Sequence, residues 1–191
     1  LWDLFKNEQG RVLEQIFDQT LESIENNFRA VYEHYYPLMQ VRPDFRIPLP
    51  KALAMSVEFV LNRDLINALE EDHVDLERLE RIAKEIKRWS FARDKETLNF
   101  SASARLNQFM NRLTQHSRDV GLLNTICEFL RILQIVPLEP ELWRAQNIYF
   151  SMLQRLYPKI KKQKDAEDPG SRDWIKNFER LGSFLKVIVH P

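Results

Sequence analysis

Apolar residues recur every three or four positions along almost the whole chain, and this spacing constrains the fold more than any other feature. Such a pattern gathers apolar side chains on one face of an α-helix, whereas a half-buried strand alternates in twos. The 191 residues include only four glycines. Hairpin turns and phosphate-binding loops commonly require glycine, so its scarcity argues against both. We therefore expect an all-α fold, an irregular bundle of six or seven helices with a long N-terminal helix.

The spacing predicts helices over about residues 2–39, 50–69, 75–89, 94–113, 117–133, 138–156 and 171–188. Expected N-caps are Asp75, Asp94, Ser117 and Ser171, because their side chains can accept from free N–H groups of a first helical turn. Gly10 is expected to kink or break the first helix. The charged, turn-rich residues 159–170 are expected to form a mobile loop.

Prolines mark the clearest connector in the chain. Pro37, Pro43, Pro48 and Pro50 follow the first apolar stripe, and proline lacks an N–H and clashes with the preceding turn. We expect these prolines to lie outside helices, except that Pro50 suits the first position of the next one. The sequence thus predicts an N-terminal helical arm with a proline-rich connector over residues 1–44. A helical bundle follows over residues 45–191, and the two together form one domain.

The chain begins within an apolar helical stripe, Leu1-Trp2-Asp3-Leu4-Phe5, so we expect it to be a piece of a larger polypeptide. Residues 1–38 also contain more aromatic side chains than a free arm would expose. Those aromatic residues are Trp2, Phe5, Phe17, Phe28, Tyr32, Tyr35 and Tyr36. Three interpretations stay open: the arm packs on the bundle, forms a homodimer through residues 1–38, or contacts an upstream domain.

Charge and composition argue against several classes of partner. The chain has 28 basic and 28 acidic residues, so it lacks the net positive charge that nucleic-acid binding favours. Acidic residues follow the basic stretch from Arg155 to Lys164 at once. No run of about 18 apolar residues is present, and we expect no signal peptide. With Cys127 as the single cysteine, we expect a cytoplasmic protein without nucleic-acid or membrane partners.

No motif for catalysis, a metal or a cofactor stands out, and we expect none of these in the chain. The histidines His34, His73, His116 and His190 lack metal-ligand spacing and are expected at surfaces or helix ends. Cys127 lies on an apolar stripe, which favours a buried structural thiol over a nucleophile. The acidic run Glu70-Glu71-Asp72-His73 is expected to be a solvated helix end rather than a metal cluster.

One helix face combines amides with aromatic rings: Trp143, Gln146 or Asn147, and Phe150. These residues are candidates for sugar or interface contacts, with a ring stacking on a sugar and the amides bonding its hydroxyls. The other interpretation is structural and is favoured, because aromatic stripes at helical spacing are usually core. In it, Gln146 is buried and bonds a neighbouring helix end or the connector over 43–49, and Trp143 packs beside it.

Three segments carry a family resemblance: Leu49-Pro50-Lys51-Ala52-Leu53, Glu58-Phe59-Val60-Leu61-Asn62, and the run from Leu138 to Tyr149. Residues 45–157 resemble an all-helical domain of unknown function at the C-terminus of a subgroup of family 57 glycoside hydrolases of the alpha-amylase or alpha-mannosidase type. The resemblance implies an accessory domain that packs on an upstream catalytic barrel of the same polypeptide and walls its sugar cleft.

In that family the catalytic carboxylates belong to the barrel, and no residue of this chain matches them. The resemblance therefore implies a non-catalytic domain whose partners are the upstream catalytic domain and a polysaccharide or oligosaccharide. The alternative is a free-standing helical protein–protein interaction module with no enzyme attached.

Overall fold

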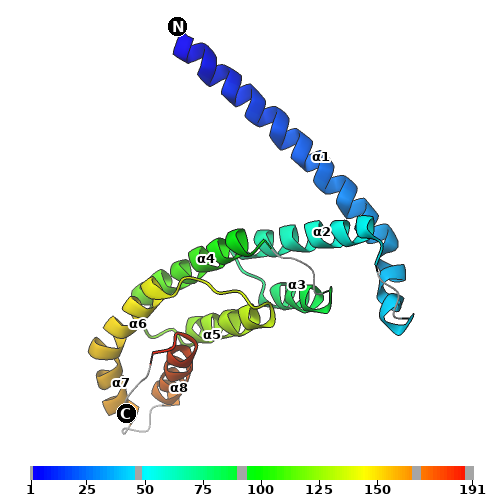
Figure 1. The fold of residues 1–191 in the computed structure, drawn as a ribbon. Coiled ribbons are helices and arrows are strands. Elements are labelled where there is room, and N and C mark those ends of the chain that lie inside the picture. The colour runs from blue at the N-terminus through cyan, green and yellow to red at the C-terminus, as the bar shows by residue number, and fades with distance from the viewer. Residues whose placement is uncertain (1, 46–48, 90–93, 165–168, 188–191) are drawn as a thin grey trace. The chain divides into compact units, whose positions relative to one another are not determined.

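The computed structural model describes residues 2–45, 49–89, 94–164 and 169–187, and within these ranges it contains eight α-helices and no strand (Figure 1). The helices are α1 Trp2–Phe45, α2 Lys51–Glu70, α3 Leu76–Trp89, α4 Lys95–Gln115, α5 Val120–Ile135, α6 Trp143–Arg155, α7 Tyr157–Lys164 and α8 Pro169–Phe184. The all-α fold is confirmed. The helix beyond the expected seven is α7, which forms where we expected a loop, and Pro158 lies in its first turn, where proline is tolerated.

Helix α1 is longer than expected, since it runs without interruption through Gly10, Pro37 and Pro43. Our expectation that these prolines lie outside helices is wrong for Pro37 and Pro43. Each proline removes one backbone hydrogen bond, and a bend relieves the clash of its ring with the preceding turn. Figure 1 shows α1 changing direction towards its C-terminal end. A glycine within a helix costs only about 1 kcal/mol relative to alanine, so Gly10 does not break it.

The chain divides into two compact units, residues 1–63 with 91–93, and residues 64–90 with 94–191. The division falls at Arg63 inside α2, whereas we expected a domain boundary between residues 44 and 45. Contact between helices explains the difference, because α1 packs on the first part of α2. The domain boundary at residue 44 stays a prediction. Of the proline-rich connector, residues 46–48 lie outside the described ranges.

In the first unit, α1 and the part of α2 up to Arg63 run in opposite directions (Figure 1). The rings of Phe28 and Phe59 lie 4.8 Å apart between centroids, and Arg63 Nε lies 3.1 Å from Glu25 Oε2. Met39 of α1 is almost completely buried. Since Arg63 lies opposite Glu25, the residues of α1 before Glu25 extend past the portion of α2 that belongs to this unit.

In the second unit, α5 is central and packs against α3, α4 and α8, while α7 joins α6 to α8. Asp75 and Asp94 act as N-caps as expected, accepting from the backbone N–H groups of Arg78 and Thr97. Ser117 does not cap α5. Asp119 does so instead, through a 2.9 Å bond from Leu122 N, because its position is two residues closer to the first turn. Ser171 lies inside α8, which begins at Pro169, so it is not a cap either.

Candidate functional site

The segment before α6 is held in an irregular conformation by side chains of α4. Glu139 N donates to Asn99 Oδ1 at 2.8 Å, and Glu141 N donates to Ser103 Oγ at 2.8 Å. Glu141 then accepts from Trp143 N at 2.6 Å, which satisfies an N–H of the first helical turn. These bonds explain why α6 begins at Trp143 and not near Pro140, as we expected.

The buried face of α6 anchors the helix on an aromatic core. Tyr149 is fully buried, stacks on Phe178 of α8 at 4.3 Å between ring centroids, and donates to Phe178 O at 3.1 Å. Trp174 stacks on the same Phe178 ring at 4.6 Å. Burial raises the pKa of Tyr149 above its ordinary value, so the phenol stays a neutral donor. α6 is thereby fixed rigidly enough for its outer face to present side chains in defined positions.

Tyr157 of α7 completes this core from a third helix. Its ring centroid lies 5.8 Å from that of Phe178, and its hydroxyl donates to Glu179 Oε1 at 2.6 Å. Burial, followed by that hydrogen bond, raises the pKa of Tyr157 to about 12. The hydroxyls of Tyr149 and Tyr157 therefore both form hydrogen bonds that hold the aromatic core together.

Gln146 lies at the edge of α6, half-buried, and its Nε2 donates to Leu185 O at 2.9 Å. The acceptor belongs to the C-terminal end of α8, where carbonyls lack partners within the helix. The structural interpretation of Gln146 is thus confirmed in its helix-end form. Its other form, a bond to the connector over 43–49, stays a prediction, because residues 46–48 lie outside the described ranges.

The other three candidate residues face solvent. Trp143 is 70% exposed and Phe150 is 51% exposed, and Asn147 is exposed between them on the same side of α6. Our expectation that Trp143 packs as a buried side chain beside Gln146 is wrong. Ala145, Tyr149 and Met152 form the buried face, so a residue at position 143 points away from the core. Large exposed aromatics on a firmly anchored helix are typical of a contact surface.

A groove with a volume of about 500 Å³ runs beside this face between α4, α6 and α7, and we call it the α4–α6 groove. Its lining residues are Thr114, Ser117, Asn147, Ile148, Ser151, Met152, Arg155, Leu156 and Lys159. The polar ones offer hydroxyls, one amide and two cations, and no carboxylate is among them. Of the candidate residues, Asn147 lines this groove. Its chemistry suits a neutral or anionic ligand rich in hydroxyl groups.

A second groove, of about 480 Å³, lies where α4 meets the irregular segment before α6, and we call it the Phe100 groove. Its lining residues are Asn99, Phe100, Ser103, Ala104, Asn107, Glu139 and Glu141. Phe100 is 74% exposed, and Asn107 Oδ1 is buried with no hydrogen-bond partner among the described residues. Sequence reasoning missed this groove, because it depends on contacts between positions about 40 residues apart.

Arg105 of α4 binds backbone carbonyls at the acidic end of α2. It is 6% exposed; its Nε donates to Leu69 O at 2.7 Å, and its Nη2 donates to Glu71 O. Burial lowers the pKa of Arg105 from its ordinary value, although the guanidinium remains charged. Glu70, Asp72 and His73 are exposed, as expected for a solvated helix end. The structure adds the arginine that binds the terminal carbonyls.

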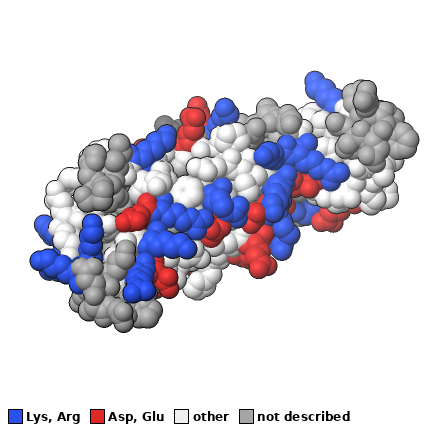
Figure 2. Space-filling model, turned by 90° about the horizontal axis from the view of Figure 1, so that it is seen from below, with Lys and Arg blue, Asp and Glu red and all other residues white. Residues whose placement is uncertain are grey.

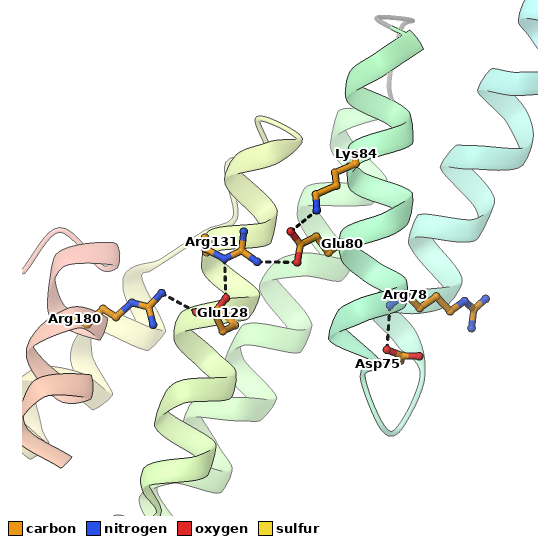
Figure 3. Close-up of polar contacts among 7 residues, drawn as sticks. All are labelled: Asp75, Arg78, Glu80, Lys84, Glu128, Arg131 and Arg180. Atoms are coloured by element: carbon orange, nitrogen blue, oxygen red, sulfur yellow. Dashed lines mark hydrogen bonds and ion pairs between the residues drawn. The ribbon is translucent and has the colours of Figure 1, made fainter. Parts of the chain in front are cut away.

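Five charged side chains connect three helices in a continuous row (Figure 3). Lys84 and Glu80 of α3 pair at 2.8 Å, and Glu80 pairs with Arg131 of α5 at 2.8 Å. Arg131 pairs with Glu128 at 2.6 Å, and Glu128 with Arg180 of α8 at 2.7 Å. The hydrogen bonds from Arg131 and Arg180 lower the pKa of Glu128, and those from Lys84 and Arg131 lower that of Glu80. Each of these charged groups pairs with another member of the row, so we assign the row a structural role.

The remaining reactive side chains offer no alternative centre. Cys127 is fully buried, and burial raises the pKa of its thiol to about 11, so it is a structural thiol as expected. His34, His73 and His116 are exposed, and His190 lies outside the described ranges. No cluster of histidine, cysteine and carboxylate groups that could hold a metal occurs among the residues described.

Charges of both signs are intermixed on the face that Figure 2 shows, without one extended area of a single sign. This agrees with the equal numbers of basic and acidic residues. Within the described ranges, no helix has the length and apolar character that crossing a membrane requires.

Comparison with protein-family models, with curated proteins and with solved structures finds no match to this chain.

Proposed function

We propose that the chain is a non-catalytic helical accessory domain of a carbohydrate-active enzyme resembling family 57 glycoside hydrolases, and that the outer face of α6 contacts the sugar. The single observation that carries the proposal is the exposure of Trp143 on a helix that the fully buried Tyr149 anchors to the core. An aromatic ring offers the apolar face of a sugar a flat surface, and neighbouring amides and hydroxyls bond its edges.

Two further features support this proposal. Trp143 lies in the segment from Leu138 to Tyr149 that carries the family resemblance, so the resemblance and the unusual surface coincide. That segment also separates the two grooves, since Asn147 lines the α4–α6 groove and Glu139 and Glu141 line the Phe100 groove. An oligosaccharide lying across α6 would find hydrogen-bonding groups on both sides of the ring.

The test is a titration of the chain with maltoheptaose and, separately, with an α-mannooligosaccharide, followed by tryptophan fluorescence. We expect a saturable change for one of the two sugars and its loss in Trp143→Ala. Because Trp143 is largely exposed, that variant keeps its thermal unfolding temperature. The matched control is Trp89→Phe, which removes a different tryptophan and keeps the response. Absence of a response to both sugars in the unaltered chain rejects the sugar contact.

The accessory role has its own test in the gene. A reading frame upstream of residue 1 that encodes a barrel with two catalytic carboxylates supports the proposal. The second candidate function is a free-standing interaction module, and the exposed apolar residues of α1 favour it. A complete gene that encodes no enzyme would decide for this second candidate.

A further inference from the structure

An apolar stripe is exposed along α1 for most of its length. Nine large apolar side chains of this helix are between 40% and 63% exposed. They are Val12, Leu13, Ile16, Phe17, Leu21, Ile24, Tyr35, Leu38 and Val41. Single exposed apolar residues need no explanation, but a continuous stripe of this kind normally marks an interface.

Within its own unit, α1 is covered on one side only. Phe28 packs against Phe59 of α2, and the exposure of Phe28, Tyr32 and Met39 is lower than that of the stripe. Before Glu25, which pairs with Arg63, the portion of α2 in this unit has ended. The large apolar side chains of the stripe from Val12 to Ile24 are therefore exposed to solvent among the residues described.

The stripe has the spacing of a coiled-coil seam. Together with the half-buried Phe28 and Val31, its central residues alternate between steps of four and three positions over three heptads: Phe17, Leu21, Ile24, Phe28, Val31, Tyr35 and Leu38. A seam of this period is what two helices need to pack side chains into one another along their length. A second helix of the same kind is the simplest partner for it.

The exposed area is sufficient for a stable complex. A large apolar side chain that is half exposed contributes about 100 Å², so the seven from Ile16 to Val41, which lie within the overlap of the pair inferred below, offer about 700 Å². A standard interface buries about 800 Å² on each partner. A dimer of this chain through α1 would bury an area close to that of a standard interface.

From the stripe, its period and its charges, we infer that α1 binds α1 of a second copy of this chain as an antiparallel pair, independently of the function proposed above. The register opposes Leu21 to Leu38 and Ile24 to Tyr35 of the other copy, with Phe28 and Val31 at the centre. All six positions from Leu21 to Leu38 in the seam then face a seam position.

Charge decides the orientation. Residues 14–25 contain four carboxylates and no basic residue, whereas residues 34–45 contain one arginine and one aspartate and are neutral. A parallel pair in register would set the acidic stretch of one copy against the acidic stretch of the other. In the antiparallel register it lies beside the neutral stretch, which avoids that repulsion.

Disulfide formation between two variants that each carry one added cysteine tests orientation and register together. Leu21→Cys and Leu38→Cys alter exposed side chains, and the buried Cys127 does not compete. Under mild oxidation, a mixture of the two variants is expected to give a covalent dimer, and Leu21→Cys alone is not. Covalent dimers from Leu21→Cys alone would indicate a parallel pair and overturn the inference, as would the absence of covalent dimers in the mixture.

Sedimentation equilibrium then measures the strength of the pair. We expect Leu21→Glu to raise the dimer dissociation constant about a hundredfold or more, since the pair would bury two unpaired carboxylates. The matched control is Gln15→Glu, which adds the same charge to α1 at an exposed position away from the seam. Circular dichroism confirms that both variants keep their helix content. An unaltered chain that sediments as a monomer at all concentrations, or equal effects of the two variants, would overturn the inference.

Discussion

Phe17 of α1 and Phe178 of α8 are the same amino acid in the same kind of apolar stripe, yet their surroundings are opposite. Phe17 is 60% exposed, whereas Phe178 is completely buried. Phe178 stacks on Tyr149 of α6 and on Trp174 of its own helix, and Tyr157 of α7 approaches it from a third direction. Helical spacing therefore shows which residues share a face of a helix, but the number of helices around that face decides whether it is buried.

The two regions differ in the same way in their polar contacts. In the second unit, Trp174 donates to Ser117 O at 2.8 Å and Gln146 donates to Leu185 O at 2.9 Å, so side chains bond backbone groups far away in the sequence. In the first unit, the contact between α1 and α2 combines the Phe28–Phe59 ring pair with the ion pair of Glu25 and Arg63. We expect the second unit to carry most of the stability of the chain.

The largest expected effect is the cost of truncating the buried phenylalanine. Phe178→Ala should lower the free energy of unfolding by about 3–5 kcal/mol, because it leaves a cavity among three aromatic rings. Phe17→Ala should change it by less than about 0.5 kcal/mol when the protein concentration is too low for dimers. Urea unfolding followed by circular dichroism measures both values. Similar losses in the two variants would show that the stripe of α1 is buried in the folded chain.

A smaller effect is expected at Gly182 of α8, which faces Tyr149 of α6. A Cβ atom at Gly182 would collide with the hydroxyl of Tyr149 and lie 2.9 Å from its Cζ, so a larger residue there must displace the ring. Gly182→Ala should lower the free energy of unfolding by about 1–3 kcal/mol. Tyr149→Phe removes the hydroxyl, so the double variant should lose less than the sum of the two single variants. Additive losses would show that the ring and the glycine are not in contact.

The sequence predicts those features of the fold that depend on neighbouring residues. Asp75 and Asp94 cap their helices as expected, because a cap is a contact over three positions. Pro37 misled us about the end of α1, since the penalty of one proline is finite and helical packing can exceed it. Ser117 and Asp119 are both good caps by type, and the choice between them depends on where α5 docks on the other helices.

The candidate site was predictable in part for the same reason. That Gln146 bonds a helix end follows from the chemistry of a half-buried amide, but that the end belongs to α8 does not follow from local sequence. Trp143 was wrongly expected to be buried, because α6 starts late and its inward face is set by Ala145 and Tyr149. The Phe100 groove was not predicted at all. Its one local signal was an exposed aromatic, and its walls come from two distant segments.

The smallest expected effect concerns the row of charges that joins α3, α5 and α8. Because its pKa is lowered in the folded state, Glu128 contributes stability above the pKa of an unfolded glutamate, about 4.3. That contribution is lost as the pH falls through the lower folded value. Its partners are partly exposed to solvent, so we expect the contribution of Glu128 to the free energy of unfolding to be less than about 1 kcal/mol.

The measurement is the difference in urea unfolding free energy between pH 7 and pH 3, compared between the unaltered chain and Glu128→Gln. The variant should show a smaller difference, and 0.5 M salt should reduce the gap between them, since salt screens exposed pairs. Glu33→Gln, a matched neutralisation of an exposed glutamate of α1, serves as the control. If Glu128→Gln and Glu33→Gln shift the pH dependence equally, the row of charges adds nothing specific, and the stability of the second unit rests on its aromatic core alone.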